Sequence, residues 1–281
     1  MKKNNRNTIN KRTSPWVYAI LVIFTVVFLY PIVWLVINSF KTNEELFLSP
    51  WTLPGSLSPE NFIRALTEAN LLRNFVNSTI ISVSVVILSV LLSAMAAYGL
   101  TRLQWKGSKL TLGIFLLGMM IPTYSTIIPL FAMFNKLGIT NTYSAVIIPQ
   151  LVFAFPISIL ILTGFFRGIP KELEEAAIID GCTVPKIFFK IIWPISTPSL
   201  VTVAVINFIT AWNDLLFPTI FMSDKDMMTL PVGLSTFQGR YSTDYVGMIA
   251  AVVITIIPSI IVYTILHDKI IDGMVAGAVK E

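Results

Sequence analysis

The segment KELEEAAIIDGCTVPKIFFKIIWPISTPSL, residues 171–200, is a charge-dense block in a chain that is otherwise strongly apolar. Of the 281 residues, 55% are hydrophobic and only 12% are charged, about half the charged fraction of a soluble domain. A water-soluble protein of this length could not cover its surface with so few charges. The sequence therefore predicts an all-α protein whose solvent is the lipid bilayer.

Apolar stretches long enough to cross a bilayer, about 20 residues each, flank this block and recur along the chain. We expect six spans, at about 16–39, 75–100, 110–134, 143–166, 199–222 and 245–267. They form one transmembrane domain over 16–267, which includes a loop at 167–198, between tails at 1–15 and 268–281. The first apolar run is too long for a signal-peptide core and no cleavage site follows it, so it is expected to be an uncleaved helix.

Lysine and arginine residues set the orientation of such a protein, because they gather in cytoplasmic loops. With the N-terminus in the cytoplasm, 14 of the 20 lie on that side. Both termini and the loop 167–198 are therefore predicted to be cytoplasmic, in a multi-pass protein of the cell membrane. This topology also accounts for the net charge of +5, so nucleic acid is not an expected partner.

Residue types needed for most catalytic chemistry are scarce. One cysteine, Cys182, excludes a disulfide framework, and one histidine, His267, leaves little scope for zinc sites or catalytic triads. The sequence contains no phosphate-binding G-x-x-x-x-G-K-[ST] loop, no H-E-x-x-H and no G-x-S-x-G. We therefore expect no enzyme activity, and any energy source must lie in another subunit.

The first half of the block at 171–200 has the signals of a short helix, about 170–180. Pro170 suits the first helical position, three glutamates follow near the positive end of the helix dipole, and Gly181 suits the C-terminal stop. Thr183 and Pro185 then predict a second helix that ends at Trp193–Pro194, and Thr197–Pro198 predicts the start of the fifth span. By themselves these residues fit either an amphipathic hairpin on the membrane surface or a docking element for a partner.

The spacing Glu175-Ala176-Ala177-x3-Gly181-x9-Ile191-x-Trp193-Pro194 resembles the EAA signature of the permease subunits of ABC importers, with Trp193 where that pattern has Leu. RNFVNSTIISVSV, AAYGLTRLQWKG, AWNDLLFPTIF and GMVAGAVKE are similar to segments of the carbohydrate-uptake, maltose-permease-like group, in its shorter six-span form. The resemblance implies a type I ABC importer permease fold in which 170–180 is the coupling helix.

The resemblance also implies partners. These are a second permease subunit, a pair of cytoplasmic ATPase subunits that hold ATP and Mg, and an extracytoplasmic sugar-binding protein; this chain itself is expected to hold no cofactor. The residues that would dock on the ATPases are Glu172, Glu174, Glu175, Ala176, Ala177, Asp180 and Gly181 in the loop, with Gly277, Ala278, Val279 and Lys280 in the tail.

Polar residues inside the spans are candidates for the transport path, because such groups face a protein interior or a wet cavity. Asn207, Thr210 and Asp214 form one stripe of the fifth span, which fits either an interhelical clamp or a path lining. Pro122 and Pro129 are expected to break the third span. The candidate substrate-lining residues are Tyr124, Asn207, Trp212, Asn213 and Asp214.

Two alternatives remain open: a permease of the same superfamily for a non-sugar solute, and a stand-alone secondary transporter. The second needs ion-coupling acids within the spans, where only Asp214 is available.

Overall fold

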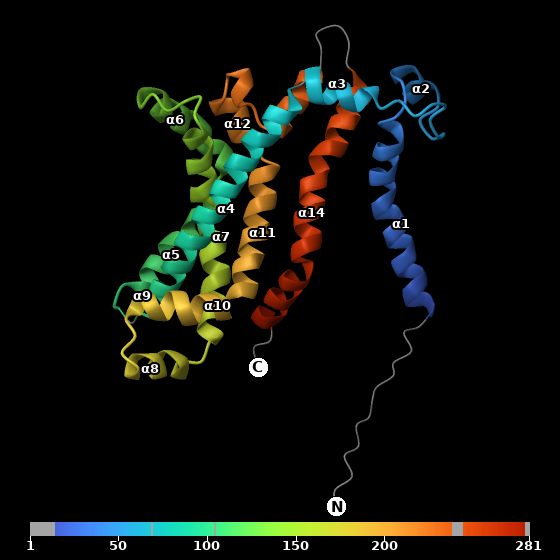
Figure 1. Ribbon diagram of the computed structural model, residues 1–281. Helices are drawn as coiled ribbons and strands as arrows, with labels where there is room; N and C mark the ends of the chain where they lie inside the picture. Colours follow the sequence, from blue (N-terminus) through green and yellow to red (C-terminus); the bar gives the residue numbers. More distant parts are fainter. Residues whose placement is uncertain (1–14, 69, 104, 238–243, 279–281) are drawn as a thin grey trace, which may run out of the picture.

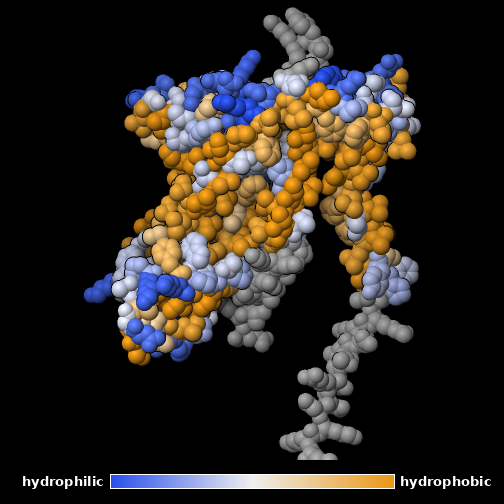
Figure 2. All heavy atoms as spheres, in the orientation of Figure 1, coloured by the Kyte–Doolittle hydropathy of each residue, from blue (hydrophilic) through white to orange (hydrophobic). Residues whose placement is uncertain are grey.

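The computed structural model describes residues 15–68, 70–103, 105–237 and 244–278, and all regular secondary structure in these ranges is helical (Figure 1). Four of the described helices are long and apolar enough to cross a membrane: α1 (Pro15–Asn38), α4 (Leu71–Thr101), α7 (Tyr143–Gly168) and α14 (Tyr245–Ala278), the last through Tyr245–Leu266. Two bent helix pairs raise the number to six if each counts as one span. On the face seen in Figure 2, an apolar belt separates two hydrophilic ends.

The predicted third span, 110–134, is divided by a sharp bend. α5 (Ser108–Leu117) continues through a 3-10 turn (Gly118–Met120), and the chain then bends by 96° into α6 (Thr123–Lys136). Pro122 causes the break, because its ring lacks an N–H and holds the preceding Ile121 in an extended conformation, with ψ 115°. Pro129 was also expected to break this span. That prediction was wrong, because α6 continues through it.

The predicted fifth span, 199–222, is also divided. α11 (Thr197–Trp212) is followed, after a turn, by α12 (Leu216–Phe221). In the turn, Asp214 Oδ1 accepts a hydrogen bond from the Leu216 N–H at 2.9 Å. Short polar side chains offer the backbone such an alternative to helical hydrogen bonds, so the helix ends at the Asn213–Asp214 pair.

Helix α4 is the central element of the bundle: it packs against α7 and α11, and α11 packs in turn against α14. Small buried side chains on α4 allow this close approach; they are Ser78, Ser82, Ser89, Ser93, Ala94 and Ala97. Asn207 of α11 links three helices, because its Nδ2 donates to Ser89 Oγ on α4 at 2.8 Å and to Ser158 Oγ on α7 at 3.0 Å. Asn207 is therefore an interhelical clamp, one of the two roles that the sequence left open.

One end of the bundle is covered by short helices: α2 (Asn43–Leu48), α3 (Glu60–Glu68) and α13 (Leu230–Leu234), with 3-10 turns at Lys225–Met227 and Ser235–Phe237. Polar contacts tie these segments to the longer helices. Arg64 of α3 pairs with Asp244, next to the start of α14, at 3.1 Å. Asn77 of α4 donates to the main-chain oxygens of Asp226 and Met228 at 2.9 and 2.8 Å.

The opposite end carries α8 (Glu172–Ile179) and a bent helix built from α9 (Val184–Ile187), a π-helical turn (Phe188–Ile192) and α10 (Trp193–Ile195). α1 begins and α14 ends on this same side (Figure 1). The segment Val184–Ile195 meets α11 at a bend of 79°, so it runs across the end of the bundle rather than along it.

Helix α1 stands apart from the main bundle and approaches it mainly near one end (Figure 1). Its side chains are exposed from residue 15 to residue 33, and nearly all of them are apolar. A helix that is apolar all round belongs in lipid or against another membrane helix. Its contacts within the described chain are chiefly with α14.

Candidate functional site

The charged loop at 167–198 contains a helix shorter than predicted. α8 has 8 residues, Glu172–Ile179, where about 170–180 was expected. Pro170 was predicted at the first helical position, but it lies before the helix, and Lys171 holds the N-cap position. Glu172, Glu174 and Glu175 do occupy the first turn, where the helix dipole favours negative charge.

Gly181 ends α8 in the way the sequence predicted. Its φ of +73° lies in the left-handed region, which glycine adopts without the strain that a Cβ brings. The Gly181 N–H donates to the Ile178 carbonyl and the Cys182 N–H to the Ala177 carbonyl, both at 2.9 Å. This pair of bonds is a Schellman motif, so the last carbonyls of α8 are satisfied and the chain turns sharply after it.

Arg102, at the end of α4, attaches α8 to the bundle. Its guanidinium forms an ion pair with Glu174 of α8, and the two side chains are only 4% and 14% exposed. The same guanidinium donates to the main-chain oxygens that end α7 and lead into α8, those of Phe166 at 3.2 Å, Ile169 at 3.0 Å and Pro170 at 3.4 Å. The Tyr98 hydroxyl also donates to Glu174, at 3.3 Å. One side chain of α4 thus holds both the end of α7 and the beginning of α8.

The two faces of α8 have different roles. Glu174 and Ala177 face the bundle, where Ala177 is 5% exposed and joins the apolar cluster around Tyr98 and Phe188. Glu174 and Ala177 were predicted to dock on a partner. The structure instead directs them inward, because positions three apart share one face of a helix. The outward face carries exposed side chains of mixed character: Glu172, Leu173, Glu175, Ala176, Ile178, Ile179 and Asp180.

The second helix of the loop continues further than predicted. It runs from Val184 to Ile195 and passes through Trp193–Pro194, which was expected to stop it. A π-helical turn precedes this proline, and the Trp193 N–H donates to the Phe188 carbonyl five residues back. Such bulges let a helix absorb an irregular position. Thr183 does hold the predicted N-cap position, although its side chain makes no capping hydrogen bond.

The tail residues proposed for docking fall at the edge of the described chain. The backbone of Gly277 and Ala278 belongs to α14, which continues well past the predicted end of the sixth span at 267. Val279 and Lys280 lie outside the described residues.

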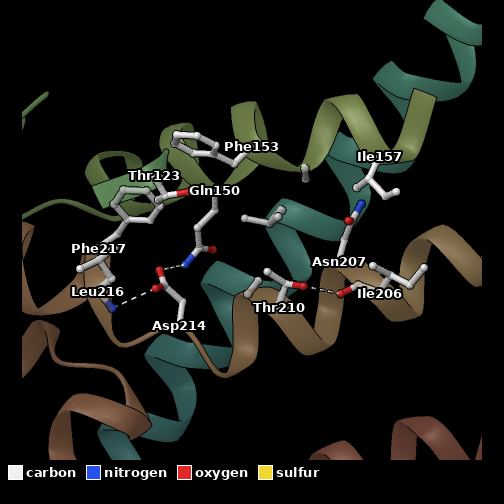
Figure 3. Close-up of a pocket in the computed structure, with 13 residues that line it drawn as sticks. Thr123, Gln150, Phe153, Ile157, Ile206, Asn207, Thr210, Asp214, Leu216 and Phe217 are labelled. Atoms are coloured by element: carbon white, nitrogen blue, oxygen red, sulfur yellow. Dashed lines mark hydrogen bonds between the residues drawn. The ribbon is translucent and has the colours of Figure 1, made fainter. Parts of the chain in front are cut away.

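A cavity of about 210 Å³ lies between α7, α11 and the start of α6 (Figure 3). Polar side chains line it: Thr123, Gln150, Asn207, Thr210 and Asp214. Gln150 Nε2 donates to Asp214 Oδ2 at 2.6 Å. The remaining lining is apolar, and Phe153 and Phe217 stack with ring centroids 6.0 Å apart. The stripe Asn207, Thr210 and Asp214 therefore does face one space, although α11 ends before Asp214.

A second hollow, of about 460 Å³, adjoins the first at Asp214 and Leu216. It is lined by Tyr124 and Asn213 among others, and Tyr124 is 77% exposed. Four of the five predicted lining residues thus border these two spaces. Trp212 does not, which corrects the prediction. It is 2% exposed and packs between Phe75 and Phe208, and its Nε1 donates to the Thr255 carbonyl at 3.2 Å.

Sequence reasoning missed Arg102, Gln150 and Thr123. In the sequence, Arg102 counted as one of the charges that set the topology. Its partner, Glu174, is 72 positions away, so no local pattern links the two. Gln150 did carry a signal, because it is a lone amide in the apolar run 143–166. Among the described residues, no group of three or more His, Cys, Asp or Glu side chains is placed to hold a metal ion.

The chain has relatives among known transport proteins. Residues 89–274 match the family described as binding-protein-dependent transport system inner membrane component. The chain is 37% identical over 280 residues to the arabinooligosaccharides transport system permease protein AraQ of Halalkalibacterium halodurans, covering 97% of this chain and 100% of that protein. It is 36% identical over 279 residues to the trehalose/maltose transport system permease protein MalG of Thermococcus litoralis, covering 98% and 99%.

The fold is similar to that of a chain in the crystal structure of a bacterial ABC transporter involved in the import of the acidic polysaccharide alginate. The TM-score is 0.78 at 21% sequence identity, and the match covers 95% of this chain and 99% of that one.

Proposed function

The chain belongs to the family of binding-protein-dependent transport system inner membrane components, and on that basis we propose that it is the permease subunit of an ATP-driven importer of a sugar or oligosaccharide. Relatives of known cargo class, AraQ and MalG, are named for arabinooligosaccharides and for trehalose and maltose. The fold is that of an ABC importer permease. The chain moves a solute and changes no covalent bond; ATP and Mg bind to partner ATPase subunits.

The attachment of α8 is the observation that carries this proposal. Arg102 fixes the inner face of α8 to the ends of α4 and α7, while the outer face remains free. That free face presents Ile179, 86% exposed, together with Ile178 at 61% and neighbouring acids. A displacement of α8 by an ATPase subunit would therefore pass directly to two membrane helices. Residues 277–280 at the end of the chain would reach toward the same subunits.

A second permease subunit is the partner expected within the membrane. The helix α1 leaves its apolar side chains uncovered by the described chain. Tyr124 and Leu215 are exposed side chains that line the hollow at Asp214. An extracytoplasmic binding protein would deliver the sugar to the end that carries α2, α3 and α13. In this orientation both termini and α8 are cytoplasmic, as the distribution of lysine and arginine predicts.

Reconstitution tests the proposal. The full-length chain, expressed with its partner subunits, is expected to co-purify with an ATPase pair and to drive uptake of maltose, trehalose or an arabino-oligosaccharide only with ATP on the ATPase side. Ile179→Asp should abolish co-purification of the ATPase while leaving membrane insertion intact. Leu103→Asp changes an exposed apolar residue in the neighbouring loop, 42% exposed, and serves as the matched control. Transport by the chain alone without ATP would refute the proposal.

A further inference from the structure

Gln150 has a buried hydrogen-bonding atom that the protein leaves unused. The residue is 8% exposed, and its Nε2 donates to Asp214. Its Oε1 is buried without a hydrogen-bond partner. Buried acceptors are nearly always satisfied, so each exception calls for an explanation. The Gln150 side chain extends from α7 into the space bounded by Asp214, Thr210 and Asn207 (Figure 3).

The amide nitrogens around this cavity donate within the protein, and the Thr210 hydroxyl donates to the Ile206 carbonyl at 2.9 Å, so the polar atoms left for a ligand are mostly acceptors. Asp214 offers two carboxylate oxygens, which already accept from Gln150 and from the Leu216 N–H. Asn207 uses its Nδ2 on two serines, which leaves its oxygen as the remaining polar atom. Among the described residues, no lysine or arginine lines this cavity or the adjoining hollow. A ligand that satisfies the site must bring O–H or N–H donors and no negative charge.

The rest of the lining is apolar and fixes the size and shape of such a ligand. Phe153, Phe217, Ile157 and Ile206 line the cavity together with the polar groups. The volume of about 210 Å³ is below the range of about 300–1,000 Å³ typical of sites for drug-sized ligands. A single ring with C–H faces and hydroxyl edges fits this combination, whereas a chain of several rings does not.

We propose that this cavity is a binding subsite for one ring of a neutral sugar, in which Gln150 Oε1 accepts a hydrogen bond from a sugar hydroxyl. The proposal rests on the proposed function and narrows its substrate class: the site disfavours acidic sugars, because a carboxylate placed beside Asp214 meets a like charge with no cation to offset it. The ring reaches the site through the adjoining hollow, where Tyr124 and Asn213 are exposed.

Cysteine protection tests the proposal in the full-length chain, in nanodiscs and within the assembled importer. Cys182, the single cysteine, is replaced by serine, and Thr210→Cys places a reporter in the cavity. The rate of labelling by N-ethylmaleimide is measured with glucose, with glucuronate or with no sugar. Glucose at ten times its Kd should slow labelling by about tenfold, because only about a tenth of the sites stay free. Glucuronate at the same concentration should leave the rate unchanged.

Two variants connect protection to the proposed contacts. Gln150→Leu should remove protection by glucose, with each labelling rate compared to that of the same variant without sugar. Thr123→Val changes a half-buried position at the start of α6, so it disturbs the core less than Gln150→Leu does. It should weaken protection by glucose several-fold. Thr67→Cys, exposed on α3 outside the cavity, controls for reagent consumption and should show no protection.

Each outcome decides a separate point. Equal protection by glucose and glucuronate would overturn the selection against acidic sugars. Absence of protection by glucose at Thr210→Cys, or full protection by glucose in both variants, would overturn the subsite. The proposed function is judged independently by ATP-driven uptake in the assembled importer, which can fail or succeed whatever the labelling shows.

Discussion

Replacement of Arg102 by methionine is expected to release α8 from the bundle. The change removes the ion pair with Glu174 and the hydrogen bonds to the main-chain oxygens of Phe166, Ile169 and Pro170. Methionine retains much of the side-chain length and apolar stem. The variant therefore tests the charged and hydrogen-bonded attachment rather than the packing of the stem.

The magnitude follows from the burial of the pair. Removing one partner of a buried ion pair costs about 3–5 kcal/mol, because the other charge is left unpaired. Glu174 keeps 14% of its side chain exposed and regains water when α8 detaches, so we take the lower end, about 3 kcal/mol. Since each 1.4 kcal/mol is about tenfold, detachment of α8 should become about a hundredfold more frequent.

Amide hydrogen exchange measures this detachment in the full-length chain. Local opening governs the exchange of protected amides, so the amides of 174–182 should exchange about a hundredfold faster in Arg102→Met. Those of α14 within 245–266 should not change. In the assembled importer, ATP hydrolysis should continue while sugar uptake per ATP falls, because α8 then moves without α4 and α7.

Two further variants separate the ion pair from a general loosening of the loop. Tyr98→Phe removes only the 3.3 Å bond to Glu174 and should cost about 1 kcal/mol or less. The double variant Arg102→Met with Glu174→Met replaces the pair by apolar side chains, which is often neutral, and should restore much of the protection. If exchange in Arg102→Met stays within threefold of the wild type and uptake stays coupled to ATP, Arg102 does not attach α8.

Three other predictions concern single positions. Gly181→Ala should cost about 1–2 kcal/mol, because at positive φ the added Cβ crowds the adjacent backbone; apart from the neighbouring residues, no atom lies within 4 Å of that Cβ. Gly181→Asn, which tolerates this conformation, should lose less protection of α8 in hydrogen exchange. Asn207→Ala should lower the free energy of unfolding by about 2–4 kcal/mol, because it leaves a buried cavity and removes the hydrogen-bond donor shared by Ser89 and Ser158. A thermal melt that matches the wild type would contradict the role of Asn207 as an interhelical clamp. Trp212→Phe should lower the free energy of unfolding by about 1 kcal/mol, through loss of the hydrogen bond to the Thr255 carbonyl. It should leave the KM for sugar uptake unchanged, whereas a raised KM would place Trp212 in the transport path.

Local signals predicted the loop well where local chemistry decides its conformation. Gly181 stops α8 because its own backbone adopts a positive φ, which glycine allows without strain. Pro122 breaks the third span because its ring acts on the residue before it. Local signals failed where packing decides. Pro129 is tolerated inside α6, and Pro194 follows a π-helical turn that no propensity scale predicts.

The candidate site shows the same division at the level of side-chain direction. Asn207, Thr210 and Asp214 were grouped by helical spacing, and they do line one cavity. Trp212 was included because it lies beside this stripe in the sequence and because an aromatic face suits a sugar ring. Residues two apart lie about 200° from one another around a helix with 3.6 residues per turn, so Trp212 points away from Thr210 into the contact with α14.

The sequence by itself determined that the chain is an all-α membrane protein, where its apolar stretches lie and where its charged loop falls. Apolar stretches of about 20 residues cross lipid as helices, and caps act within one turn. Tertiary structure alone decided which face of α8 is free. Arg102 and Glu174 are 72 positions apart, and their pairing turns Glu174 and Ala177 inward. Tertiary structure also decided that Gln150 contacts Asp214. That contact exists only because α7 packs beside α11 and because α11 ends just before Asn213.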